Sequence, residues 1–111
     1  MQQIRDGDIP LPKATQTLGM KIIELDPDVG AVELEFDAKE EFTNPIGNIQ
    51  GGFLAAMLDD TMGPALSLLL GPRQFAPTLE MKISYIAAAR VGKITAYGRV
   101  VSKGNSICFT E

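Results

Sequence analysis

Polar and apolar residues alternate in the N-terminal half of the chain, which predicts a β-hairpin. Residues 31–38, AVELEFDA, place apolar side chains between acidic ones, a period of two that is typical of a half-buried antiparallel strand. A first strand is predicted at 20–25, and DPDVG at 26–30 forms the turn because it combines Pro, Asp and Gly. Residues 1–17 have no clear period and are interpreted as a loose lead-in, with a short helix near 15–18.

The middle of the chain is a long apolar run that predicts one helix. Residues 51–70 are rich in Leu, Ala and Met and contain neither Val nor Ile, a composition that favours helix. The helix is predicted to begin at the glycine pair 51–52 and to stop at Gly71-Pro72. Pro64 is expected to kink it or to start a second segment. Residues 39–50 form a polar link, with room for one helical turn, and a loop.

Strand-like alternation returns after the helix and completes the predicted fold. The order is two strands, one helix and three strands in a single α+β domain of 111 residues. A curled antiparallel sheet wrapped around the helix explains why that helix is apolar on nearly every side. The last three strands are TLEMKISYI, KITAYGRVVS and SICFTE, at 78–86, 93–102 and 106–111, separated by turns at 87–92 and 103–105.

The composition narrows the class of partner. A net charge of −4 and a pI near 4.7 argue against nucleic acid, whose partners normally carry a basic stripe. The apolar run 53–70 contains two aspartates and a proline, which are costly in a bilayer, so no membrane partner is expected. Residues 1–12 lack the apolar core of a signal peptide. Cys108 is the one cysteine, and a reducing, cytoplasmic location is expected.

Histidine is absent from the sequence. This excludes Ser-His-Asp and Cys-His catalysis, histidine-ligated metals and a histidine general base. No metal site is expected. Any chemistry must therefore use carboxylates, hydroxyls, amides, Lys, Arg or backbone groups.

Two features of the predicted helix suggest more than packing. Gly51 and Gly52 place free N–H groups at the positive end of the helix dipole, where a ligand can approach closely. An oxyanion there would gain roughly 3–4 kcal/mol per donor; alternatively, the glycines only permit a tight junction. Asp59 and Asp60 are costly in an apolar helix unless paired or used. Adjacent positions differ by about 100°, so one can face a site as base or nucleophile, although both can equally be solvated or capping.

Three neutral hydrogen-bonding residues also stand near the helix in the sequence. Asn44 precedes Pro45 and is an ordinary turn residue. Gln50 is a candidate helix cap or surface amide, and Thr78 a candidate first residue of a strand. Each is a weak indicator by itself.

Together these residues form a more specific pattern. N-P-x-G-x-x-Q-G-G-x-x-x-x-x-x-D at 44–59 is followed by P-T-x-E-M-x-I-x-Y at 77–85 and A-x-x-G-K at 89–93. The pattern resembles the hotdog-fold acyl-CoA thioesterases, in particular the phenylacetate-pathway (PaaI-like) branch. The resemblance extends from about Leu18 to Glu111 and implies a curled antiparallel sheet around one long central α-helix. It also implies a dimer, often paired into a tetramer, with sites at the subunit interface.

The resemblance implies a role for each matching residue. Gly51 would supply the oxyanion-hole N–H to the thioester carbonyl. Asp59 would be the nucleophile or general base and would come from the partner subunit, whereas Asp60 would be structural. Asn44 would help to position the water or the carboxylate, and Thr78 would place a hydroxyl near that water.

Coenzyme A would enter as part of the substrate, with no separate cofactor. Its arm would run past residues 85–90 and the turn at 102–107. Arg90 and Lys103 would bind its phosphates. The full set of expected substrate contacts is Gly52, Tyr85, Arg90, Lys103, Asn105 and Ser106.

The chain departs from the family pattern at two places. The family usually has His-Gly-Gly where this chain has Gln50-Gly51-Gly52, and a glutamine can donate and accept hydrogen bonds but cannot titrate. If the family histidine serves to orient neighbouring groups or to contact the carbonyl, Gln50 can take its place. If the charge of that histidine is needed, activity would be weak or absent. The family pattern also continues past Glu111, so the fold is expected without its final strand or strands, leaving an exposed edge unless another subunit covers it.

The leading hypothesis is therefore hydrolysis of an acyl-CoA thioester to a free acid and CoA. A non-catalytic acyl-CoA binding or sensing module is the main alternative, prompted by Gln50 and the early end. Dehydratase or hydratase chemistry is disfavoured because those members use a catalytic histidine. A structural dimerisation domain would leave an aspartate in an apolar helix without a use. The acyl chain is not specified, and the candidates for an adaptable apolar pocket, or else for core packing, are Phe53, Met57, Met62, Phe75 and Met81.

Overall fold

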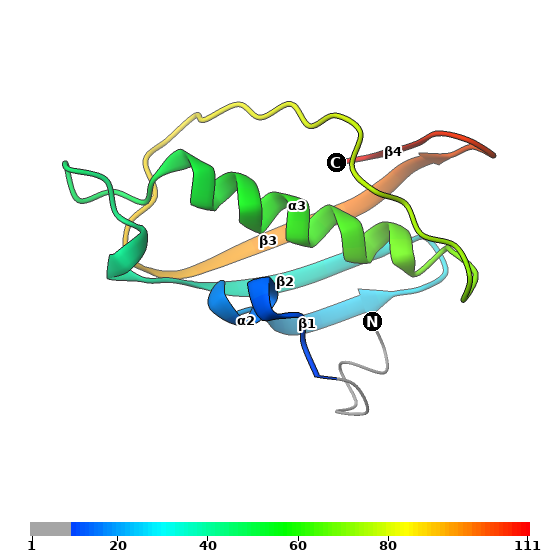
Figure 1. Ribbon diagram of the computed structural model, residues 1–111, viewed down its shortest axis with the longest axis horizontal. Coiled ribbons are helices and arrows are strands. Elements are labelled where there is room, and N and C mark those ends of the chain that lie inside the picture. Colours follow the sequence, from blue (N-terminus) through cyan, green and yellow to red (C-terminus); the bar gives the residue numbers. More distant parts are fainter. Residues whose placement is uncertain (1–9) are drawn as a thin grey trace.

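The computed structural model describes residues 10–111 and contains one antiparallel sheet with one long helix across it (Figure 1). The sheet has the strand order β1-β2-β3-β4. This arrangement confirms the predicted hotdog architecture. The elements are α2 (Lys13–Thr17), β1 (Lys21–Asp26), β2 (Ala31–Ala38), the 3-10 turn η1 (Glu40–Phe42), α3 (Gly51–Ser67), β3 (Gly92–Lys103) and β4 (Cys108–Thr110).

The predicted hairpin is confirmed. β1 pairs with β2 in antiparallel register, with an irregularity between Ile22 and Glu24. Along β2 the apolar side chains are buried, and Leu34 and Phe36 have no exposed surface, while the acidic residues between them retain exposure. The lead-in predicted for residues 1–17 lies partly outside the described residues; within them, α2 occupies nearly the predicted place.

The long helix is continuous through its proline. α3 begins at Gly51, as predicted, but ends at Ser67, and residues 68–70 form a turn. Of the two outcomes predicted for Pro64, a kink or the start of a second segment, the second does not occur, because α3 is continuous from Gly51 to Ser67. Gly63 has no Cβ to clash with the proline ring, so it tolerates the helical conformation before a proline, and Leu68 N donates to the Pro64 carbonyl at 3.2 Å.

The helix approaches the sheet closely at one point. Thr61 is fully buried, and its Oγ1 donates to the Met57 carbonyl at 2.6 Å. A Cβ atom on Gly98 of β3 would lie 2.9 Å from Thr61 Cγ2 and 3.0 Å from the Thr61 carbonyl oxygen. Gly98 therefore allows the backbone of α3 to pack against β3.

The strand predicted at 78–86 does not form. Residues 74–91 are an irregular connection that runs back along α3 to the start of β3 (Figure 1). Period-two alternation favours a strand, but a strand needs a neighbour for its backbone N–H and C=O groups. β3 already pairs with β2 on one side and with β4 on the other, and residues 78–86 pair with neither of the outer strands, β1 and β4. The alternation survives only in part, because Met81 and Ile83 are half-buried whereas Leu79 and Tyr85 are exposed.

Candidate active site

The loop before α3 is closed by Asn44. Its side-chain oxygen Oδ1 accepts the N–H groups of Ile46 at 3.0 Å and Asn48 at 3.1 Å. Its backbone N–H donates to the Asn48 carbonyl at 2.7 Å, and Gly47 takes a positive φ of 95° within the turn. The ordinary turn role considered for Asn44 is thus present, and the same turn sets the direction in which the chain enters α3.

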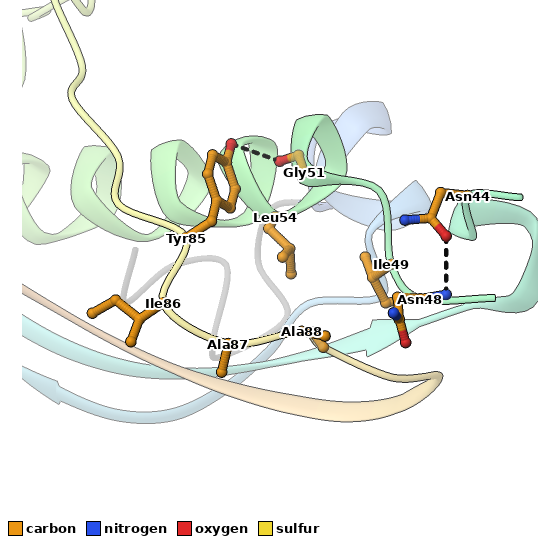
Figure 2. A pocket seen from close by; sticks show the side chains of 10 residues that line it. Asn44, Asn48, Ile49, Gly51, Leu54, Tyr85, Ile86, Ala87 and Ala88 are labelled. Atoms are coloured by element: carbon orange, nitrogen blue, oxygen red, sulfur yellow. Dashed lines mark hydrogen bonds between the residues drawn. The ribbon is translucent and has the colours of Figure 1, made fainter. Parts of the chain in front are cut away.

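The first turn of α3 presents backbone donors. Among residues 10–111, no acceptor takes the N–H of Gly51 or Gly52, as expected for the first positions of a helix. Gln50 is the N-cap residue, and its side chain makes no capping hydrogen bond. Figure 2 shows Tyr85 reaching from the 74–91 connection to Gly51, where its hydroxyl donates to the Gly51 carbonyl at 3.0 Å.

A pocket of about 310 Å³ lies beside this helix start (Figure 2). Its walls come from the 44–49 loop, the first turn of α3 and residues 85–89. None of the lining side chains is charged. Three predicted site residues, Asn44, Gly51 and Tyr85, lie on this pocket, and the complete lining is Asn44, Asn48, Ile49, Gly51, Leu54, Tyr85, Ile86, Ala87, Ala88 and Ala89.

The residues considered for an apolar pocket do not line it. Met57 is buried in the core cluster, and the Phe53 ring stacks on Phe42 with a centroid distance of 4.2 Å. Phe75 is 87% exposed on the 74–91 connection. The core-packing alternative is thus correct for Met57. The apolar side chains that line the pocket belong to residues that the sequence did not single out, which are Ile49, Leu54 and Ile86 to Ala89.

Asp59 and Thr78 meet on the exposed side of α3. Thr78 Oγ1 donates to Asp59 Oδ1 at 2.7 Å, joining groups that are 19 residues apart in the chain. Neither residue lines the pocket. Asp59 follows Gly51 by eight residues, a separation of about 12 Å along a helix. Within one chain, the Asp59 carboxylate therefore lies apart from the pocket at the start of α3.

Asp60 points to a different environment. Its Oδ1 accepts a hydrogen bond from Thr15 of α2 at 3.1 Å, and its Oδ2 is buried without a partner among the described residues. Burial raises the pKa of Asp60, and the neighbouring charge of Asp59 adds to this, while the Thr15 hydrogen bond opposes it. The sequence did not reveal this contact, because nothing in it pairs position 15 with position 60.

Asp60→Asn is expected to stabilise the fold at neutral pH. The folded-state pKa of Asp60 lies above its ordinary value of 3.8, so protonation of Asp60 stabilises the folded state. This stabilisation is fully present below pH 3.8 and is lost as the pH rises through the folded-state pKa. A neutral amide removes the buried charge at pH 7. We expect the free energy of unfolding to rise at pH 7 and to stay unchanged at pH 3. Urea denaturation at both pH values measures it; destabilisation at pH 7 would contradict the assignment.

The other predicted substrate contacts are spread over the molecule. Arg90 follows the pocket wall directly, and Gly52 is exposed at the helix start. Lys103, Asn105 and Ser106 surround the β3–β4 turn, at the opposite end of α3 from the pocket (Figure 1). One chain thus does not bring these groups together.

The described residues hold no group of three or more His, Cys, Asp or Glu side chains that could bind a metal ion. Nor does any helix in residues 10–111 have the length and apolarity needed to cross a membrane. The pocket offers backbone N–H groups, the amides of Asn44 and Asn48 and the hydroxyl of Tyr85, while the Asp59 carboxylate lies apart from it.

A family model for the thioesterase superfamily matches residues 46–111. Human acyl-coenzyme A thioesterase 13 is 33% identical over 85 residues, which are 74% of this chain and 59% of that protein. A second curated relative, from Saccharolobus solfataricus, is 32% identical over 94 residues, 85% of this chain and 65% of the relative. The chain thus spans less than two thirds of the length of these relatives.

A solved structure agrees with the fold. A phenylacetic acid degradation-related protein from Ralstonia eutropha JMP134 superposes with a TM-score of 0.94 at 30% identity, covering 98% of this chain and 83% of that one. The resemblance to PaaI-like hotdog proteins that the motifs indicated is confirmed.

Proposed function

This chain belongs to the thioesterase superfamily, and on that premise we propose that it hydrolyses an acyl-CoA thioester to a free acid and CoA. The observation that carries the proposal is the 2.7 Å hydrogen bond from Thr78 to Asp59. It joins the carboxylate and the hydroxyl that the family pattern assigns to the reaction. A solvent-accessible carboxylate held by a hydroxyl is suited to accept a proton from water or to attack a carbonyl carbon.

In the proposed reaction, the thioester carbonyl oxygen lies at the start of α3. The N–H groups of Gly51 and Gly52, which no acceptor in residues 10–111 takes, stabilise with the helix dipole the negative charge that develops on that oxygen. Asp59 takes a proton from a water molecule as the water oxygen bonds to the carbonyl carbon. The carbon–sulfur bond then breaks, CoA leaves as a thiolate that takes up a proton, and the acid is released.

We propose that the complete site contains two subunits. Asp59 is too far along α3 to act on a carbonyl bound at the Gly51 of its own chain, so Asp59 and Thr78 would serve the pocket of a partner. The 74–91 connection supports this because its backbone has no sheet partner in the described part of the chain, and it exposes 79% of Leu79 and 94% of Ile86. A second copy would cover this apolar segment. A dimer and a tetramer both satisfy this proposal.

The two-subunit site also accommodates the scattered substrate contacts. Arg90 beside the pocket and Lys103 at the β3–β4 turn are exposed cations suited to the phosphates of CoA. They lie near opposite ends of α3, so the CoA arm would contact one of them on each subunit. Asn105 and Ser106 would add hydrogen bonds from the same turn as Lys103.

A non-catalytic acyl-CoA binding module is the second candidate. The observation that favours it is Gln50, whose side chain makes no capping bond and which cannot titrate. The first experiment is release of free CoA from a panel of short-chain, medium-chain and aryl acyl-CoAs. Turnover supports the hydrolase. Binding seen by calorimetry without any release would support the binding module instead.

Thr78→Val is expected to lower kcat about tenfold, because it removes the donor that holds the Asp59 carboxylate while keeping the shape of the side chain. Thr78→Ser keeps the hydroxyl and serves as the matched control, with kcat near that of the wild type. CoA release at saturating substrate measures both. Equal kcat in Thr78→Val and the wild type would remove Thr78 from the mechanism.

A further inference from the structure

The 74–91 connection is attached to the helix and its loop at three points. Thr78 donates to Asp59 at 2.7 Å, Tyr85 donates to the Gly51 carbonyl at 3.0 Å, and the Ala89 carbonyl accepts the Ile49 N–H at 2.8 Å. Two of the three bonds end on the residues that the proposed function uses. A segment without strand pairing is thus held by the same groups that would perform the chemistry.

Tyr85 makes two different contacts with Gly51. Its hydroxyl bonds the carbonyl oxygen, and its ring atoms Cε1 and Cζ lie 3.2 Å from the point where a Cβ on Gly51 would stand. A side chain at position 51 would therefore press against the ring. Figure 2 shows the Tyr85 side chain beside Gly51, whose carbonyl belongs to the peptide unit between Gly51 and Gly52.

That peptide unit contains one of the two donors of the proposed oxyanion hole. The carbonyl that Tyr85 bonds and the N–H of Gly52 belong to the same peptide group. A hydrogen bond accepted by the carbonyl polarises this group and strengthens its N–H as a donor. It also restrains a helix start that has reason to fray, because two glycines occupy it and Gln50 makes no side-chain cap.

We propose that Tyr85 is a positioning residue for the N–H group of Gly52, acting through the peptide unit that this N–H shares with the Gly51 carbonyl. This inference rests on the proposed function. It differs from the contact with CoA that the family resemblance implies for Tyr85, because the hydroxyl proton is already given to Gly51. A group that orients donors affects the transition state more than the bound substrate.

The test compares Tyr85→Phe with Tyr97→Phe, which changes the other tyrosine of the sequence. Tyr97 lies on β3, is 70% exposed, and its hydroxyl has no hydrogen-bond partner in residues 10–111. Tyr85→Phe is expected to lower kcat for CoA release about fivefold, the value of one ordinary hydrogen bond, with KM changed by less than about twofold. It should also speed hydrogen–deuterium exchange of the Phe53 and Leu54 amides, which donate to the Gln50 carbonyl at 3.0 and 3.4 Å in the first turn of α3. Tyr97→Phe should change neither.

The two readouts separate the inference from the function on which it rests. A rise in KM with kcat unchanged would make Tyr85 a substrate contact and overturn the proposal. Should the wild type release no CoA, the hydrolase proposal fails, and amide exchange still decides about Tyr85. Exchange of the Phe53 and Leu54 amides that is the same in Tyr85→Phe as in the wild type would then overturn the positioning role.

Discussion

Asp59→Asn is expected to lower kcat for CoA release by about 10²–10⁴-fold, the usual contribution of a general base or of a carboxylate that attacks the substrate. Asparagine has the size of aspartate, and its side-chain oxygen can still accept the bond from Thr78, which is 2.7 Å long in the wild type. What it loses is the ability to accept a proton or to form an acyl bond. The loss should appear in kcat and kcat/KM together.

Asp60→Asn is the matched control for this result. It makes the same chemical change at the next position, on a side chain that faces α2 and not the 74–91 connection. It should keep the turnover of the wild type. Loss of turnover in Asp60→Asn, with Asp59→Asn unaffected, would exchange the roles of the two carboxylates and refute the proposed mechanism.

The contrast between the two aspartates comes from the rotation between adjacent helical positions. Asp59 meets a hydroxyl on an exposed segment, whereas Asp60 turns toward Thr15, which is 3% exposed. The sequence predicts that two such neighbours differ in environment. It does not predict which segments they meet, because those contacts cross 19 and 45 residues of chain.

The parts of the fold that local pattern controls were predicted well. The β1–β2 hairpin, the start of α3 and the long strand β3 each follow from periodicity or from a glycine junction within the element itself. The segment 78–86 shows the limit of this reasoning. Its alternation is that of a strand, yet strand formation depends on a neighbouring backbone, which no local pattern supplies.

The candidate site divides in the same way. Gly51, Asp59 and Thr78 were predicted because their spacing resembles a known family. The pocket wall at Ile86 to Ala89 was not predicted. These residues are apolar and carry no reactive group, and they form part of the site only because the fold places them beside the start of α3. The hydrogen bond from Tyr85 to Gly51 was also missed. It depends on the path of an irregular connection, and irregular segments carry little local signal.

The position of α3 on the sheet connects stability to the proposed chemistry. The same helix carries Gly51 at its first residue and Asp59 two turns later. Its height above the sheet is set where Thr61 packs on Gly98, with a hypothetical Cβ only 2.9 Å from Thr61 Cγ2 and 3.0 Å from a backbone oxygen. A flexible side chain can turn aside, but a backbone oxygen cannot, so a side chain at position 98 requires the backbone of α3 at Thr61 to shift by a few tenths of an ångström.

Gly98→Val is therefore expected to destabilise the fold by about 2–3 kcal/mol, in the upper part of the range for overpacked cores. Valine is favourable for a strand, so the loss isolates the contact with Thr61. Thr95→Val on the exposed face of β3 is the matched control and should change the free energy of unfolding by less than about 0.5 kcal/mol. Urea denaturation measures both variants. An unchanged denaturation midpoint for Gly98→Val would mean that α3 moves away from β3 without a cost in stability. Because that movement also displaces Gly51 and Asp59, CoA release by the folded variant would then report whether the proposed site depends on the distance between α3 and the sheet.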